Sequence, residues 1–150
     1  MATPRWKPHV TVAGIIEADG RFLLVEERAA DGLRINQPAG HLEDGETLLE
    51  AVAREVLEES ACRFVPDWLT SIYQWRDVAN ERTFMRFAFC GRATGPLPAQ
   101  RLDAGIERTL WMTRDEVAAA ADRFRSPWVL VCIDDYLSGW RMPLDSIRSL

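Results

Sequence analysis

The sequence predicts an α/β fold of the α+β kind, in which helices pack on the faces of a mixed β-sheet. Segments with strand-like and helix-like patterns interleave along the chain. The turn signals Asp19-Gly20 and Asp31-Gly32 indicate hairpins, which add antiparallel pairs to the sheet. The chain has 150 residues, so we expect a single domain over residues 1–150.

The first part of the chain is expected to be mostly strand. Residues 9–18 are rich in Val and Ile and predict one strand, with residues 21–26 as its hairpin partner. Residues 33–38 predict a short strand that ends at Pro38. A loop over residues 40–46 then leads to a helix over residues 46–60, which contains good helix formers throughout.

The second part is expected to alternate again between strand and helix. The expected elements are strands over 63–75, 83–92 and 109–112, and helices over 113–124 and 126–137. Thr113 and Glu116 form a capping box, and Ser126 is the expected N-cap of the last helix, with Pro127 at its first position. Gly139 ends that helix. We expect the tail from Arg141 to be loosely attached.

Composition narrows the functional classes. The net charge is −5, from 18 basic and 23 acidic residues, which argues against binding to a nucleic-acid backbone. It allows a phosphate-bearing substrate, because a bound metal can invert the local potential. No apolar run is long enough to span a membrane, and residues 1–8 lack a signal-peptide core. Cys62, Cys90 and Cys132 lie far apart in apolar stretches, so we expect buried, reduced thiols and a cytoplasmic protein.

One stretch, residues 40–62, indicates chemistry. At about 100° per residue its helix has an apolar arc that we expect to face the core, formed by Leu49, Val52, Ala53, Val56 and Leu57. The opposite arc is polar and contains Glu50, Arg54, Glu55, Glu58 and Glu59. This spacing is expected to bring the carboxylates of Glu55, Glu58 and Glu59 to one place.

Three clustered carboxylates favour a metal site. Like charges at this spacing destabilise a helix by about 0.2–0.5 kcal/mol per pair. Arg54 lies four residues from both Glu50 and Glu58, and its positive charge offsets part of this repulsion. Hard oxygen donors are the ligands that Mg²⁺ or Mn²⁺ requires. The alternative is a solvated acidic helix face, which is common for runs of charge.

The spacing of the whole stretch favours the metal site. Gly40, Glu46 and the run Arg54-Glu55-Val56-Leu57-Glu58-Glu59 resemble the signature of the Nudix hydrolases, which fixes six polar or glycine positions at set offsets. Further segments are similar to the NudJ branch of that family: KPHVTVA (7–13), NQPAGHLE (36–43), FMRF (84–87), RSP (125–127) and SGWRMPL (138–144).

The resemblance implies a Nudix-type α/β/α sandwich with a central mixed sheet. It implies ligands for Mg²⁺ or Mn²⁺ at the matching positions, which are Glu55, Glu58, Glu59 and the backbone carbonyl of Gly40. Arg54 is expected to orient a carboxylate, and Glu46 to support the junction of loop and helix. Glu55 is also a candidate for the general base, with Glu107 and Asp103 in a late loop as alternatives.

One position departs from the family pattern. The family has glycine where this chain has Ala61, at the end of the helix, where a left-handed conformation is common. An alanine in that conformation costs on the order of 1 kcal/mol. The substitution therefore bears on where the helix ends, and it removes no metal ligand.

Four residues are expected to touch the substrate: Arg86, Gln37, His41 and Trp75. Strand alternation places Arg86 opposite Phe87, where its guanidinium would clamp a phosphate, or would be a surface arginine on a polar strand face. Trp75 would stack on a pyrimidine ring or belong to the core. His41 lies beside Gly40 and Gln37 near the signature loop.

The resemblance implies an enzyme that hydrolyses the diphosphate linkage of a small organic pyrophosphate. Enzymes of the NudJ type act on hydroxymethylpyrimidine pyrophosphate, a thiamine precursor, and on nucleoside tri- and diphosphates. The alternatives are an enzyme for another diphosphate, such as an oxidised nucleotide or a nucleotide sugar, and a Nudix-fold nucleotide-binding module that does not cut. The expected partner is the small-molecule substrate, with neither membrane nor nucleic acid, for a monomer or small homo-oligomer.

Overall fold

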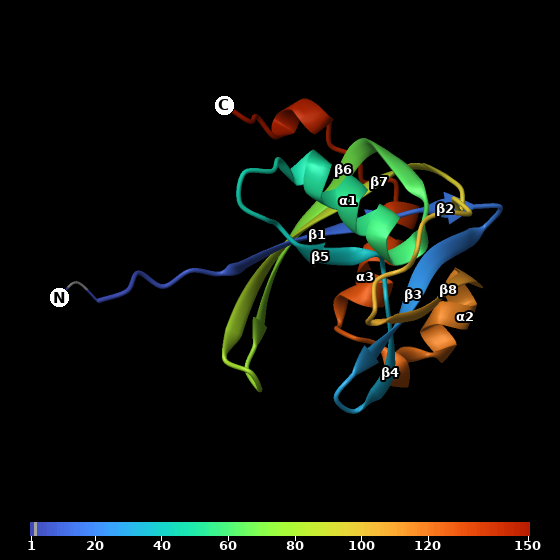
Figure 1. Cartoon of the computed structure of the whole chain (residues 1–150), viewed down its shortest axis with the longest axis horizontal. Coiled ribbons are helices and arrows are strands. Elements are labelled where there is room, and N and C mark those ends of the chain that lie inside the picture. The colour runs from blue at the N-terminus through green and yellow to red at the C-terminus, as the bar shows by residue number, and fades with distance from the viewer. Residues whose placement is uncertain (2) are drawn as a thin grey trace.

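Two β-sheets form the framework of the molecule (Figure 1). The computed structural model describes residue 1 and residues 3–150. The first sheet contains, in spatial order, β5 (Ala39–His41), β1 (His9–Ile15), β7 (Arg82–Thr94) and β6 (Arg63–Asp77). Because β1 runs parallel to β7 while β5 and β6 are antiparallel to their neighbours, this sheet is mixed, as the sequence predicts.

The second sheet is built around the long strand β3 (Arg21–Ala29). β3 pairs antiparallel with β2 (Glu17–Ala18), β4 (Gly32–Asn36) and β8 (Ile106–Thr113). β8 is longer than the expected strand over 109–112, because its pairing with β3 continues to Ile106.

The single strand expected over residues 9–18 is in fact two strands in different sheets. β1 lies between β5 and β7, whereas β2 pairs with β3 in the second sheet. The chain passes from one sheet to the other at Ile16, whose carbonyl accepts a hydrogen bond from Leu23 N–H at 2.9 Å. Alternation of apolar residues does not mark this change of partner.

The signature helix α1 (Leu48–Ser60) has well-defined ends. Thr47 is its N-cap, and Thr47 and Glu50 form a reciprocal capping box, so the helix begins at Leu48 rather than at residue 46. Ala61 is the C-cap with φ 59° and ψ 16°, the left-handed conformation that the family's glycine adopts easily. The helix therefore ends at the expected place despite the alanine.

The later helices confirm one predicted cap and correct another. α2 (Arg114–Ala119) begins with the expected capping box of Thr113 and Glu116, and is followed by the 3-10 turn η1 (Ala121–Arg123). α3 (Trp128–Leu137) has Pro127 as its N-cap and no side-chain cap bond. The expected cap at Ser126 is therefore wrong, and its hydroxyl is not used in this way.

Helices cover opposite faces of the sheets and form two apolar cores (Figure 1). Val52 and Val56 of α1 pack with Val12 and Phe89 in one core. Val129 and Ile133 of α3 pack in the other core, together with residues of β3 and β7. This arrangement is the α/β/α sandwich that the sequence predicts. Cys62, Cys90 and Cys132 are buried and free, also as expected.

The buried face of α1 differs from the expected arc. Its buried residues are Ala51, Val52, Glu55, Val56, Glu59 and Ser60. Two signature glutamates therefore belong to the buried face, while Ala53 and Leu57 are only partly buried. The reason is that α1 lies against the edge strand β5 as well as the apolar core, and the glutamates face that polar strand edge.

The expectation of a loosely attached tail is wrong. The backbone of Met142 exchanges hydrogen bonds with Leu69 at 2.8 and 3.0 Å, which extends the edge of β6. Leu144 and Ile147, in and after the turn η2 (Leu144–Ser146), pack on the core under α1. Within the described part of the chain, no helix has the length and apolar character needed to cross a membrane.

Ala61→Gly is expected to raise the free energy of unfolding by up to about 1 kcal/mol. The left-handed conformation costs alanine roughly 1–2 kcal/mol, which exceeds the roughly 0.8 kcal/mol lost with one buried methyl group. Urea unfolding measures the change. The control is Ala120→Gly at the C-cap of α2, where φ is −101° and glycine should reduce stability. A larger loss at Ala61 than at Ala120 would contradict the strain.

Candidate active site

Arg54 organises the acidic side chains of α1. Its guanidinium donates to both carboxylate oxygens of Glu46 at 2.7 and 3.0 Å, to Glu55 at 2.8 Å and to Glu58 at 3.2 Å. It also donates to the carbonyl of His41 at 3.0 Å. The hydrogen bonds to Glu46 contribute most to raising the pKa of Arg54. Arg54 thus orients carboxylates, as expected, and ties α1 to the loop before it.

Glu55 lies against Gly40 of the edge strand β5. Its side chain is about one-tenth exposed, and a Cβ atom added to Gly40 would lie 2.1 Å from the carboxylate. Only glycine therefore permits this approach. Burial raises the pKa of Glu55 against the hydrogen bond from Arg54, and the charges of Glu58 and Asp103 raise it further.

Glu59 reaches the same strand one residue earlier. Its carboxylate accepts a hydrogen bond from the backbone N–H of Ala39 at 3.0 Å. Burial, together with the charges of Glu55, Glu27 and Asp103, raises the pKa of Glu59 to about 8. The hydrogen bond from Ala39 N–H opposes this shift. A carboxyl group in such surroundings needs a cation or a proton to be stable.

Glu58 completes the set at the more exposed side, where its side chain is 35% exposed. Among the described residues, no three acidic, histidine or cysteine side chains already converge as a metal site. The Arg54 guanidinium lies between Glu55 and Glu58. The expectation that the carboxylates of Glu55, Glu58 and Glu59 meet at one place is therefore wrong for this arrangement: Glu55 and Glu59 lie against β5, while Glu58 lies on the more exposed side. Their donor chemistry still fits a hard divalent cation.

The free edge of β5 supplies a backbone oxygen. Leu42 N–H bonds to the Val10 carbonyl and Gly14 N–H to the Pro38 carbonyl. With the register of Val12 opposite Gly40, alternation turns the amide groups of Gly40 toward β1. Those of Ala39 and His41 point outward, where Glu59 and Arg54 bind them. The Ala39 carbonyl is therefore better placed than that of Gly40 to face a cation.

The two acids expected in a late loop differ in their surroundings, because Asp103 lies in the loop before β8 while Glu107 belongs to β8 itself. The backbone N–H of Asp103 donates to the Glu58 carbonyl at 2.9 Å, so its loop is fixed to α1. Its charge affects both Glu55 and Glu59. Glu107 instead forms an ion pair with Arg28 and is 40% exposed. The structure thus brings Asp103, and not Glu107, to the signature carboxylates.

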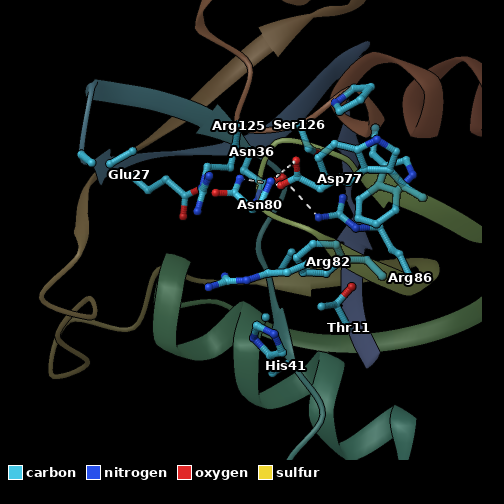
Figure 2. Close-up of a pocket in the computed structure, with 18 of the residues that line it drawn as sticks. Thr11, Glu27, Asn36, His41, Asp77, Asn80, Arg82, Arg86, Arg125 and Ser126 are labelled. Carbon is cyan, nitrogen blue, oxygen red and sulfur yellow. Dashed lines mark hydrogen bonds and ion pairs between the residues drawn. The ribbon is translucent and has the colours of Figure 1, made fainter. Parts of the chain in front are cut away.

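A pocket of about 980 Å³ opens on the other side of β5 (Figure 2). Ala39, Gly40 and His41 line it, whereas Glu55, Glu58 and Glu59 do not. Its remaining walls come from the first sheet, from the β3–β4 hairpin, from the tip of the β6–β7 hairpin and from the residues at the start of α3. The strand β5 therefore separates the carboxylates from the pocket.

Two rows of paired residues form the pocket side of the first sheet. In the first row, Thr11 lies opposite both His41 and Arg86. In the second row, Phe84 lies opposite both His9 and Trp75. Side chains directly opposite one another share a sheet face, so the alternation that set Arg86 apart from Phe87 in the sequence is correct.

Aromatic rings form one wall of the pocket. Trp75 and Phe84 stack with their centroids 5.8 Å apart, and Trp128 of α3 meets their edges at 5.4 and 6.2 Å. The Arg86 guanidinium lies 4.5 Å from the centre of the Trp128 ring. Such a wall suits a planar ring.

Several polar atoms of the pocket residues have no partner. Among the described residues, the Thr11 hydroxyl, the Arg86 Nε and the Ser126 hydroxyl are buried without a hydrogen bond. Unsatisfied buried groups are uncommon in proteins and cost free energy. All three of these residues line this one pocket.

Three of the four residues expected to touch the substrate line the pocket, and the fourth lies behind it. Trp75, His41 and Arg86 line the pocket. His41 Nε2 lies 3.2 Å from His9 Nδ1 at the pocket rim. Gln37 is 1% exposed and lies behind the pocket, where it accepts a hydrogen bond from Arg86 at 3.2 Å. Gln37 therefore supports Arg86 rather than lining the cavity.

Sequence reasoning alone did not select several lining residues, among them Thr11, Asn36, Phe84, Arg82, Ser126 and Trp128. Four of them lie inside the short segments that resemble the NudJ branch, at 7–13, 36–43, 84–87 and 125–127. Those segments were the available signal. Which of their residues face one pocket depends on strand pairing over long distances.

Comparison with known proteins identifies the family. A model of the NUDIX domain matches residues 5–131. The chain belongs to the Nudix family. Members of this family typically depend on a divalent metal ion.

Similar proteins place this Nudix chain more closely. Phosphatase NudJ of Escherichia coli strain K12 is 42% identical over 143 residues, which cover 95% of this chain and 92% of that protein. A NUDIX hydrolase from Nitrosomonas europaea is 46% identical, with a TM-score of 0.92 over 96% of this chain and 98% of that one. MutT protein from Methanosarcina mazei Go1, at 20% identity and a TM-score of 0.72, covers 89% of this chain and 96% of that one, and shows the fold alone.

The protein is therefore a Nudix pyrophosphohydrolase similar to the NudJ phosphatases. Because the similarity extends along nearly all of an enzyme, it sets aside the alternative of a module that binds nucleotides without cutting them.

Gly40→Ala is expected to lower the free energy of unfolding by about 1–3 kcal/mol, because the new methyl group would overlap the Glu55 carboxylate. Thermal unfolding measures the loss. Gly105→Ala is the matched control, since a Cβ atom there meets nothing within 4 Å. Equal stability of the two variants would show that α1 and β5 are less tightly packed than described.

Proposed function

We propose that this Nudix enzyme cleaves the diphosphate linkage of a small organic pyrophosphate whose organic group is a planar ring. The candidate substrates are hydroxymethylpyrimidine pyrophosphate and nucleoside di- or triphosphates. One observation carries the proposal: a pocket with an aromatic wall opens at the same short strand, β5, that the signature carboxylates approach from the other side.

The proposed metal ligands are the carboxylates of Glu55, Glu58 and Glu59, with a backbone carbonyl at the edge of β5. Strand alternation favours the carbonyl of Ala39 over that of Gly40. A bound Mg²⁺ or Mn²⁺ would supply charge stabilisation for phosphate oxygens and activation of a water molecule. Arg54 would hold Glu55 and Glu58 in place, as its hydrogen bonds already do.

The proposed general base is Glu55. It is buried beside Gly40, and this burial raises its pKa, so its carboxylate accepts a proton more readily than that of an exposed glutamate. Asp103 is the alternative, because its loop is fixed to the carbonyl of Glu58. Glu107 is the weaker alternative, since Arg28 already pairs with it.

Other diphosphates that carry a planar ring, such as oxidised nucleotides and nucleotide sugars, remain alternatives with the same carboxylates and a different occupant of the pocket. A substrate panel separates them. It should contain hydroxymethylpyrimidine pyrophosphate, nucleoside di- and triphosphates, an oxidised nucleotide and a nucleotide sugar, each with Mg²⁺ and with chelator. Metal-dependent release of phosphate, fastest with the pyrimidine pyrophosphate, is the expected result; no turnover of any of them would refute the proposal.

Glu58→Gln is expected to lower kcat at least about a hundredfold while the melting temperature stays close to that of the wild type, because a ligand is lost from a partly exposed position. Steady-state kinetics and calorimetric unfolding measure the two effects. Glu50→Gln is the matched control on the same helix, since glutamine also completes a capping box. Full activity of Glu58→Gln would remove Glu58 from the site.

A further inference from the structure

The acidic side chains that line the pocket are all engaged with neighbouring side chains. Each has a partner among the described residues: Glu27 pairs with Arg125 at 3.2 Å, Asp31 pairs with Arg34, and Asp77 accepts a hydrogen bond from the Asn80 amide at 2.7 Å. Each carboxylate therefore already has a donor, and a ligand that enters the pocket does not have to supply one.

Three of the four arginines that line the pocket are also engaged. They are Arg125 with Glu27, Arg28 with Glu107, and Arg86 with Gln37. The fourth, Arg82, is exposed at the start of β7 and forms no ion pair or side-chain hydrogen bond with any described residue. Its guanidinium carries five N–H donors, which are therefore available to a ligand.

The turn of the β6–β7 hairpin explains why Arg82 lacks a partner. Asp77 lies directly opposite Arg82 in the strand pairing, a position that favours an ion pair. Asn80 in the turn instead donates to the Asp77 carboxylate, through its side-chain amide at 2.7 Å and its backbone N–H at 3.4 Å. The Asp77 carboxylate thus closes the turn, and the Arg82 guanidinium is left for another anion.

Arg82 lies on the face of the first sheet that forms the pocket. Arg82, Phe84 and Arg86 alternate along β7, so their side chains share this face. Arg86 is buried at the inner end of the row, Phe84 belongs to the aromatic wall, and Arg82 is exposed at the open end. A ring bound against this wall would therefore have Arg82 on its solvent side.

The charge of Arg82 also acts on the end of β5. Burial lowers the pKa of His41, the last residue of β5, and the charges of His9 and Arg82 lower it further. Figure 2 shows the Arg82 side chain extended above the His41 ring. Since β5 separates the pocket from the carboxylates of α1, Arg82 lies on the side of the pocket from which a substrate would reach them.

We propose that Arg82 binds the diphosphate group of the substrate on the pocket side of β5. This inference rests on the proposed function, because it adds a phosphate-binding residue to the same site. A planar guanidinium can donate to two phosphate oxygens at once. Its place at the open end of the aromatic wall, next to β5, is where the diphosphate would continue from the ring toward the carboxylates.

Arg86 is less suited to this role, although the sequence suggested a phosphate clamp there. Its side chain is 4% exposed, and its guanidinium donates to Gln37 at 3.2 Å and to Asn36 at 3.5 Å. The buried Cys132 also lies against it. These neighbours hold the Arg86 guanidinium inside the protein, whereas that of Arg82 is exposed and can move to meet a phosphate group.

The test measures binding of inorganic pyrophosphate and of cytidine diphosphate by calorimetric titration with Mg²⁺, in the Glu58→Gln background so that neither ligand is consumed. Adding Arg82→Met should weaken binding of both ligands about tenfold, the effect of losing one charge-assisted hydrogen bond. Arg82→Lys keeps the charge without the planar fork and should weaken binding only about threefold. Arg76→Met is the matched control, because Arg76 is exposed on the same hairpin and does not line the pocket, so binding should be unchanged.

Inorganic pyrophosphate separates contact with the diphosphate from contact with the ring, because it has no organic group. If Arg82→Met weakens binding of cytidine diphosphate alone, the guanidinium contacts the ring and the inference is wrong. Unchanged binding of both ligands would overturn it as well. An equal loss in Arg76→Met would show an effect of overall charge rather than a contact, which also contradicts the inference.

Turnover tests the proposed function separately. In the wild-type background, Arg82→Met should raise KM for cytidine diphosphate about tenfold and leave kcat within about twofold, because the contact binds substrate and transition state alike. Failure of the wild type to hydrolyse any member of the substrate panel would count against the proposed function, while the Kd values for inorganic pyrophosphate would still report on Arg82. Equal Kd values with and without Arg82→Met would count against Arg82 alone.

Discussion

The close approach of α1 to the three-residue strand β5 is the contact on which the site depends. Gly40 has no side chain, and Glu55 occupies the space that a Cβ atom would fill. Glu59 then reaches the N–H of Ala39 on the same strand. A wider spacing would leave both carboxylates either solvated or buried without partners. The lack of a side chain at Gly40 therefore allows α1 to pack this close to β5.

Charge balance explains why one arginine has so many partners. Glu46, Glu55 and Glu58 all bind Arg54, which is partly buried and also bonds the carbonyl of His41. A single guanidinium can serve several acceptors because its five donors lie in one plane. It does not balance Glu59, whose pKa is raised by burial and then by the charges of Glu55, Glu27 and Asp103.

The sequence predicted what depends on neighbours along the chain. The signature helix, its carboxylates, the capping box at Thr113 and most strands follow from local spacing and were found. The strand β5 was expected to be loop because three residues carry too little pattern. The attachment of the tail through Met142 and the grouping of pocket residues depend on pairing between distant segments. The burial of Glu55 and Glu59 could not be inferred, because helical periodicity does not reveal that a polar strand edge would face them.

Because β5 lies between the carboxylates and the pocket, the proposed metal ligands and the pocket walls come from separate segments of the chain. The proposed metal ligands lie on one helix, while the cavity is built from the opposite sheet face, two hairpins and the start of another helix. Mutations at Phe84, Ser126 or Trp128 can therefore change which organic group the pocket binds and leave the carboxylates of α1 in place. A lineage with this layout can acquire new substrates by small steps, each of which leaves a working catalyst.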